Sequence, residues 1–292
     1  MLRIELLVDA RNDLGEGPLW DVQEQRLYWI DSHGKLIQRC DARGQGVERW
    51  GLPEHVGSMC LREQGGAVVS LRNGFHLFDF ATGAATLIAD PEQGILRTRL
   101  NDGKVDRQGR FVAGYMDYEE KDPLGGLYRL DPDLTVTRLD GGIIVSNGPC
   151  FSPDGATLYF ADSWTRCIFA YDYDVATGAV LSRKVFTNFE QAGLRGYPDG
   201  ATVDTEGFVW SAEVYGGRLV RFAPDGTIDR LVGMPVDSIT SVNFGGADLD
   251  ILFVTSMARP FRGQRRQERE AGGLFAVHGL AVRGMAEPRF KG

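Results

Sequence analysis

The chain has 292 residues, of which 43% are hydrophobic, and its 32 basic and 40 acidic residues give a formal net charge of -8 at pH 7. This length and apolar content can bury a large core, so we expect a single domain over residues 1–292. The acidic balance argues against a nucleic-acid partner, because binding to a phosphate backbone requires a basic face.

The chain begins with charged residues and a short apolar strand at residues 4–8. Arg3 and Glu5 interrupt the apolar core that a secretory signal needs, and no later apolar run approaches the length of a membrane span. The sequence therefore predicts a cytoplasmic protein with no membrane partner. The strand at residues 4–8 has no matching neighbour in the chain and counts as a spare strand.

Short apolar strands then recur along the whole chain, separated by turns rich in glycine, proline and aspartate. Glycine and proline supply 38 and 12 residues, and no stretch shows sustained helical periodicity. Short strands at regular spacing indicate an all-β protein. The clearest of these strands are, in chain order, residues 27–29, 36–37, 75–78, 127–130, 158–160, 168–171, 209–212, 219–222 and 274–277.

An internal repeat places oxygen-bearing side chains at one fixed phase. Glu16 and Asn147 each lie eleven residues before the leucine of a matching strand. Asn101, Asn147 and Asp199 each lie eight residues before a turn glycine. Two weaker copies bring the total to six, and the residues at this phase are then Glu16, Gly57, Asn101, Asn147, Asp199 and Thr240.

Six copies with spacings near fifty residues predict a six-bladed β-propeller of about four strands per blade. The last copy has too little chain for a complete blade. We therefore expect the N-terminal strand to complete the last blade and close the ring, which leaves no long sheet edge exposed. The aromatic residues at the repeated strand positions should pack between blades, and they are Trp29, Tyr159, Phe160, Trp210 and Phe253.

In a propeller, equivalent positions of the inner strands lie at one height around the channel, so Glu16, Asn101, Asn147 and Asp199 should form a ring. Two carboxylates and two amide oxygens, completed by water, make a hard-oxygen site for one divalent cation. Calcium fits this ligand type best, while magnesium, manganese, zinc and ferrous ion stay open. The alternative is that these residues only start turns and bind backbone groups, but four copies in phase favour the metal site.

The four cysteines lack CxxC spacing, which favours reduced, buried thiols over disulfides or zinc ligation. The basic stretch at residues 262–269 is interleaved with Gln and Glu, so we interpret it as a solvated surface loop. The four histidines show no ligand spacing either. The cysteines are Cys40, Cys60, Cys150 and Cys167.

Four motifs, spread over essentially the whole chain, resemble the SMP-30/gluconolactonase/LRE family. They are LGEGPLW at residues 14–20, RLNDGKVD at 99–106, SNGP at 146–149 and YPDG at 197–200. The resemblance implies a six-bladed propeller that binds one divalent cation in its channel, and many members of the family hydrolyse sugar lactones.

The resemblance also implies roles for individual residues. Glu120 is the alternative to Glu119 as an acidic substrate contact on the lid, and Tyr115 departs from the threonine of many relatives. The implied metal ligands are Glu16, Asn147 and Asp199, and the implied substrate contacts are Arg99, Asn101 and Glu119.

Hydrolysis of a lactone builds negative charge on the carbonyl oxygen and needs a nucleophilic water. A bound cation would polarise the carbonyl as a Lewis acid, and Asp199 would act as general base, passing the proton of the water to the ring oxygen. We therefore predict a lactonase acting on a small sugar lactone. The alternatives are a metal-dependent aryl-ester or organophosphate hydrolase and a non-catalytic calcium-binding propeller.

Overall fold

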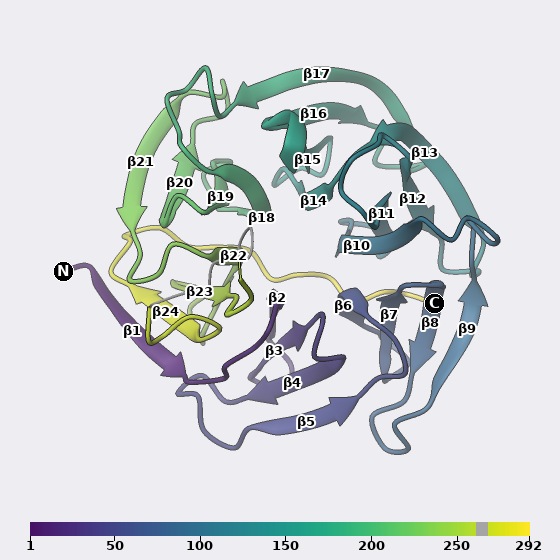
Figure 1. The fold of residues 1–292 in the computed structure, drawn as a ribbon, viewed down its shortest axis with the longest axis horizontal. Helices are drawn as coiled ribbons and strands as arrows, with labels where there is room; N and C mark the ends of the chain where they lie inside the picture. The colour runs from purple at the N-terminus through teal and green to yellow at the C-terminus, as the bar shows by residue number, and fades with distance from the viewer. Residues whose placement is uncertain (261–267) are drawn as a thin grey trace.

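The computed structural model describes residues 1–260 and 268–292, and it forms six four-stranded antiparallel sheets arranged as blades around an axis (Figure 1). The predicted all-β, six-bladed β-propeller is therefore confirmed. The described ranges contain one short 3-10 turn, η1 (Ser163–Thr165), and no α-helix. Within them, no helix has the length and apolar character needed to cross a membrane. Most of the basic stretch that we interpreted as a surface loop falls at residues 261–267, outside the described residues.

Each blade repeats one order of strands from the channel outwards. The innermost strands are β2 (Gly15–Asp21), β6 (Val56–Leu61), β10 (Thr98–Val105), β14 (Ser146–Phe151), β18 (Tyr197–Val203) and β22 (Ile239–Gly245). The second strands are β3 (Arg26–Asp31), β7 (Ala67–Leu71), β11 (Phe111–Asp117), β15 (Thr157–Asp162), β19 (Val209–Val214) and β23 (Ile251–Ser256). The third strands are β4 (Leu36–Cys40), β8 (Gly74–Phe78), β12 (Gly125–Leu130), β16 (Cys167–Tyr173), β20 (Arg218–Phe222) and β24 (Leu274–His278). The outermost strands are β5 (Glu48–Gly51), β9 (Ala85–Ala89), β13 (Val136–Ile143), β17 (Val180–Asn188), β21 (Ile228–Gly233) and β1 (Arg3–Val8).

The N-terminal strand closes the ring, as the sequence predicts. β1 pairs antiparallel with β24, so that Leu6 lies opposite Phe275 and Ile4 opposite Val277. The last blade therefore consists of three strands from the end of the chain and one from its beginning (Figure 1). This pairing ties the two ends of the repeat array together and covers the edge of β24.

The hydrophobic core lies between neighbouring blades. Trp29 in the first blade packs in one cluster with Phe253 of the last, and Trp210 packs with Phe244 at 6.0 Å between ring centroids. Trp29, Trp210 and Phe253 are fully buried, and Phe160 is 1% exposed. The prediction that the repeated aromatic residues pack between blades is confirmed, since each core cluster draws on two adjacent blades.

The repeated turn glycines follow from backbone geometry. Gly109, Gly155 and Gly207 have φ values of 88°, 75° and 84°, which residues with a Cβ rarely adopt. Each glycine N–H donates to the carbonyl three residues earlier, as in a tight turn between the first and second strands of a blade. The phased residues lie near the start of each inner strand and these turns follow its end, so the turns lie at the opposite end of the channel.

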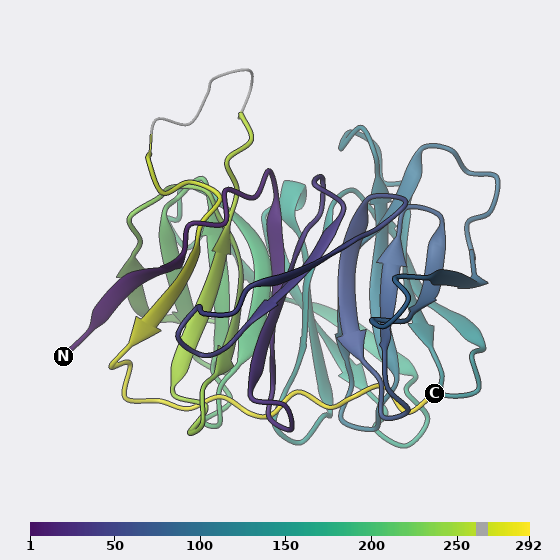
Figure 2. The same cartoon turned by 90° about the horizontal axis from the view of Figure 1, so that it is seen from below.

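After β24 the chain crosses the lower face of the ring. Residues 279–292 run below the blades rather than forming a strand of their own (Figure 2). Isolated backbone bridges join Gly284 to Asp204 and Phe290 to Arg62, on two different blades. Lys291 also donates its N–H to the carbonyl of Gly109 at 3.1 Å. This segment is therefore a strap that ties several blades together from below.

Candidate active site

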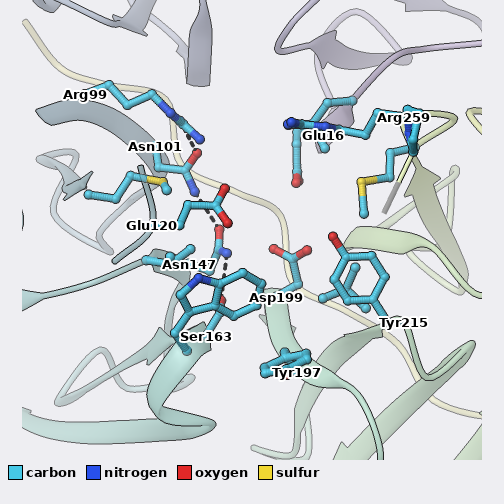
Figure 3. A pocket seen from close by; sticks show the side chains of 17 residues that line it. Glu16, Arg99, Asn101, Glu120, Asn147, Ser163, Tyr197, Asp199, Tyr215 and Arg259 are labelled. Atoms are coloured by element: carbon cyan, nitrogen blue, oxygen red, sulfur yellow. Dashed lines mark hydrogen bonds between the residues drawn. The ribbon is translucent and has the colours of Figure 1, made fainter. Parts of the chain in front are cut away.

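The structure brings the four phased side chains Glu16, Asn101, Asn147 and Asp199 into one pocket (Figure 3). They come from β2, β10, β14 and β18, and the pocket has a volume of about 560 Å³. Residues separated by more than 180 positions in the sequence thus face one cavity, because equivalent positions of neighbouring inner strands lie at the same level.

A β-bulge in each of the four inner strands directs these side chains towards the pocket. A bulge bends the strand and redirects its side chains, and Gly17 and Gly148 supply the left-handed conformation inside two of the bulges, with φ values of 54° and 55°. The repeat therefore carries a bulge as well as a polar residue at this phase. The pairing register shifts between Glu16 and Leu19, Leu100 and Gly103, Asn147 and Cys150, and Pro198 and Ala201.

A chain of hydrogen bonds orients the two amides. Arg99 Nη1 donates to Asn101 Oδ1 at 2.6 Å, and Asn101 Nδ2 donates to Asn147 Oδ1 at 2.8 Å. Asn147 Nδ2 donates to Ser163 Oγ at 2.9 Å, and Ser163 Oγ donates to the carbonyl of Pro198 at 2.7 Å. Each amide therefore has one defined orientation, with the Asn147 oxygen on the side of Asn101 and the Asn147 nitrogen turned to Ser163.

The two carboxylates lie in an environment that disfavours negative charge. Burial, followed by repulsion from Asp199 and Asp102, raises the pKa of the Glu16 carboxyl well above its usual value. Burial and repulsion from Asp102 likewise raise the pKa of Asp199. Asp199 is 6% exposed, and its Oδ1 atom has no hydrogen-bond partner among the described residues. A buried, unpartnered carboxylate oxygen is costly unless a cation or a proton meets it.

These donors fit the divalent cation that the sequence suggests. Glu16 and Asp199 supply two negative charges, and Asn147 Oδ1 supplies a neutral oxygen beside them (Figure 3). Hard oxygen donors of this kind suit calcium and similar ions. Residues 1–260 and 268–292 contain no group of three or more His, Cys, Asp or Glu side chains arranged to hold a metal ion. A cation in this pocket would therefore need the amide oxygen as well as the two carboxylates.

Below the carboxylates the channel narrows. Asp102 accepts hydrogen bonds from the backbone N–H groups of Gly103 and Gly148, at 2.8 and 2.9 Å. Lys104 pairs with Glu287 of the strap at 3.3 Å, and the space that these residues line measures only about 30 Å³. The roomy part of the channel is therefore the upper pocket.

The loop between β11 and β12, residues 118–124, places its two glutamates differently. Glu120 lines the pocket, whereas Glu119 is exposed outside it and pairs with Lys121 at 3.1 Å. Glu120 has a φ of 58°, a left-handed conformation at the point where the loop turns. Of the two alternatives for an acidic substrate contact, Glu120 is the one with access to the cavity.

Three aromatic side chains form a wall that the repeat pattern did not indicate. Trp164 and Tyr197 meet edge to face at 4.7 Å, and Tyr197 lies 6.3 Å from Tyr215. All three line the pocket, and Figure 3 labels Tyr197 and Tyr215 among them. Trp164 lies on η1 and Tyr215 in the loop after β19, so only Tyr197, the first residue of the YPDG motif, had a signal in the sequence.

Arg259 also lines the pocket and was missed by the sequence analysis. Its Nη1 donates to His33 Nε2 at 2.7 Å. Burial, followed by repulsion from Arg259 and Arg99, lowers the pKa of His33 to about 3, so the imidazole is neutral at neutral pH and can accept this bond. No strand repeat could have predicted Arg259, because it lies in a loop after β23.

Tyr115 is not among the residues that line this pocket. It is buried, and its hydroxyl donates to Asp90 Oδ1 at 2.8 Å. All four cysteines are free thiols, of which three are buried and Cys167 is half-buried.

Comparison with known proteins identifies the family. The SMP-30/gluconolactonase/LRE-like region matches residues 14–258. 6-Deoxy-6-sulfogluconolactonase of Pseudomonas putida is 38% identical over 290 residues, which cover 99% of each chain. L-Arabinolactonase of Azospirillum brasilense is 37% identical over 294 residues, which cover 98% of this chain and 95% of that protein. The crystal structure of a calcium-binding protein, regucalcin, from Agrobacterium tumefaciens strain C58 has a TM-score of 0.90 at 27% identity, covering 98% of this chain and 96% of that chain. The chain described here belongs to the SMP-30/gluconolactonase/LRE-like family.

Proposed function

We propose that this protein is a metal-dependent lactonase that opens the ring of a sugar lactone to the aldonic acid. The observation that carries the proposal is the meeting of Glu16, Asn147 and Asp199 with Arg99 and Asn101 in one pocket. Two relatives that match nearly the full chain are named for lactonase activity, one on a sulfogluconolactone and one on L-arabinolactone. Their similarity supports the reaction class, and the pocket supports its chemistry.

Glu16, Asn147 and Asp199 would hold the cation, for which calcium is the best match to the ligand type. A regucalcin of similar structure is described as calcium-binding, which supports this choice. When bound, such an ion supplies Lewis-acid polarisation of the lactone carbonyl. The fixed orientation of Asn147 by Asn101 and Ser163 would keep its oxygen available without rearrangement.

Asp199 is the proposed general base. One of its carboxylate oxygens would take a proton from the attacking water as the water oxygen bonds to the carbonyl carbon, and the bond between that carbon and the ring oxygen would then break. The same carboxyl would return the proton to the ring oxygen, which leaves as a hydroxyl. The unpartnered Oδ1 atom supports this role, since no described residue competes for it.

Arg99 and Asn101 would orient the substrate from one side of the pocket, and Glu120 would accept a hydrogen bond from a sugar hydroxyl. The aromatic wall offers Trp164 and Tyr215 to the apolar faces of the sugar. Charged and polar groups at this density favour a polyhydroxylated substrate over an aryl ester or an organophosphate.

The proposed function is tested by removing and restoring the metal. Protein stripped with a chelator should open no lactone, and reloading with calcium, magnesium, manganese, zinc or ferrous ion should restore activity with one or more of these ions. The assay is a pH indicator with a panel of pentono- and hexonolactones, with spontaneous opening subtracted. If stripping lowered the melting temperature while neither the stripped nor the reloaded protein opened a lactone or ester, the protein would be a non-catalytic calcium-binding propeller.

Glu120→Gln is expected to raise KM for the lactone about tenfold, because it removes a charged acceptor from the pocket wall. Steady-state kinetics on the best substrate of the panel measures this change. Glu119→Gln is the matched control, since its side chain lies outside the cavity in the same loop. A larger effect of Glu119→Gln than of Glu120→Gln would assign the lid contact to Glu119 instead.

A further inference from the structure

Two arginines face each other across the mouth of the pocket. Arg99 and Arg259 both line the cavity, and their guanidinium groups point towards each other from opposite walls (Figure 3). Arg99 is buried and Arg259 is half-buried. Burial lowers the pKa of Arg99 and attraction to Glu120 opposes this shift, while smaller contributions of opposite sign come from repulsion by Arg259, which lowers the pKa, and attraction to Glu16, which raises it. Two like charges therefore converge on one space.

Neither arginine forms an ion pair with a residue that the structure describes, which sets the two apart from other buried arginines. Arg221 pairs with Asp204 at 2.7 Å, and Arg110 pairs with Asp106 at 2.5 Å. Leaving a guanidinium without a carboxylate in a partly dry site is unfavourable unless a ligand supplies the negative charge. The pocket mouth thus has the electrostatic character of an anion site.

Both arginines stem from backbone positions nearer the mouth than the proposed metal ligands, and the Arg99 side chain reaches back to Asn101. Arg99 precedes Asn101 by two residues on β10, or about 7 Å along a strand towards the mouth. Arg259 follows Ser256, the last residue of β23, and so also lies beyond the upper end of its blade. A molecule with its carbonyl at Glu16 and Asp199 would bring its far end to the arginines.

The local bonding of Arg259 leaves it able to bind an anion. Its Nη1 is held by neutral His33, and Nε and Nη2 form no hydrogen bond with a described residue. A guanidinium can donate two parallel bonds from these atoms to a carboxylate, sulfonate or phosphate. His33 therefore fixes the side chain without neutralising it.

We propose that Arg259, held by His33 and assisted by the charge of Arg99, binds an anionic group at the end of the substrate remote from the lactone carbonyl. The preferred substrates are then acidic sugar lactones that carry a terminal carboxylate, sulfonate or phosphate. This inference rests on the proposed lactonase function and names its substrate class.

The test compares Arg259→Gln with the wild type on four hexonolactones that differ only at the terminal carbon. One is neutral, and the others carry a carboxylate, a phosphate or a sulfonate. The wild type should show a higher kcat/KM for at least one acidic lactone than for the neutral one, by tenfold or more. Arg259→Gln should lower that ratio by about tenfold to a hundredfold, as expected for loss of a charge-assisted pair. The ratio for Arg259→Lys should lie between those of the wild type and Arg259→Gln, because lysine keeps the positive charge and loses the two parallel N–H donors of the guanidinium.

Arg72→Gln is the matched control. Arg72 lies over the Tyr118 ring at 4.7 Å, near the lid but outside the cavity lining, so this variant makes the same change in net charge. Its acidic-to-neutral ratio should equal that of the wild type. If the acidic-to-neutral ratio fell equally in Arg72→Gln and Arg259→Gln, the effect would come from the net charge of the protein, and the proposal would be overturned. A wild type that prefers no acidic lactone over the neutral one would overturn it as well.

A binding measurement separates this inference from the proposed function. Titration calorimetry with glucitol and glucitol 6-phosphate, neither of which contains a lactone ring, should show tighter binding of the phosphate to the wild type and loss of that difference in Arg259→Gln. Hydrolysis of neutral lactones without such a difference would refute the anion site alone. Selective binding of the phosphate without hydrolysis of any lactone would refute the lactonase alone.

Discussion

Replacing Asp199 with asparagine is expected to lower kcat for lactone hydrolysis by about a thousandfold, the middle of the usual range for loss of a general acid–base group. An amide cannot take the proton of the attacking water, and the exchange also removes one of the two negative charges proposed to hold the cation. Asparagine has nearly the size and shape of aspartate, so the pocket should keep its form. The measurement is kcat at saturating lactone, with the rate of spontaneous opening subtracted.

Two controls accompany this variant. Asp133→Asn makes the same chemical change in an exposed turn of another blade and should leave kcat unchanged. The melting temperature of Asp199→Asn should lie within a few degrees of the wild type, which separates loss of chemistry from loss of fold. Turnover close to the wild-type value in a folded Asp199→Asn protein would refute the assignment of the base.

Removing residues 1–10 is expected to lower the melting temperature by at least about 10 °C, since several partly buried apolar side chains leave the last blade. Ile4 and Leu6 pack on one core cluster, and Leu7 and Val8 pack on another. The truncation also exposes the edge of β24, which can then pair with a second chain. Scanning calorimetry and size-exclusion chromatography measure the two effects.

A shorter truncation provides the comparison for this experiment. A chain that starts at Arg3 lacks only the exposed residues Met1 and Leu2 and keeps all of β1. It should melt at the wild-type temperature and stay in the same oligomeric state. If the protein without residues 1–10 also melted unchanged and did not associate further, closure of the ring by β1 would contribute little to stability.

Much of this architecture follows from the sequence because the repeat imposes it. The phase that carries Glu16, Asn101, Asn147 and Asp199 is set by the distance from the turn after each inner strand, and equal distances bring these positions to one level. The two weaker copies occupy the same phase for structural reasons. At Gly57 a Cβ would lie 2.4 Å from the carbonyl oxygen of Asn101, and Thr240 is buried and donates its hydroxyl to the carbonyl of Gly15. The same phase therefore serves the pocket in four blades and packing in two.

The rest of the site could not be predicted from the repeat, because it belongs to loops. Arg259 and Tyr215 follow the upper ends of strands, and the loops there differ in length and composition from blade to blade. Glu119 and Glu120 are neighbours in sequence, and only the turn of the chain at Glu120 decides which of them reaches the cavity. The histidines gave no signal as metal ligands, and the role of His33 depends on Arg259, more than 220 residues away. The cytoplasmic location stays a prediction from the sequence.

The strap below the ring affects how substrate and product can reach and leave the pocket. Glu287 of the strap pairs with Lys104 beside the narrow lower part of the channel, whereas the wide pocket lies at the end where the two arginines are found. Opening a lactone ring adds a carboxylate to the molecule, and this new negative charge would be attracted by the same two guanidinium groups. The acid product is therefore expected to compete with the substrate for the pocket.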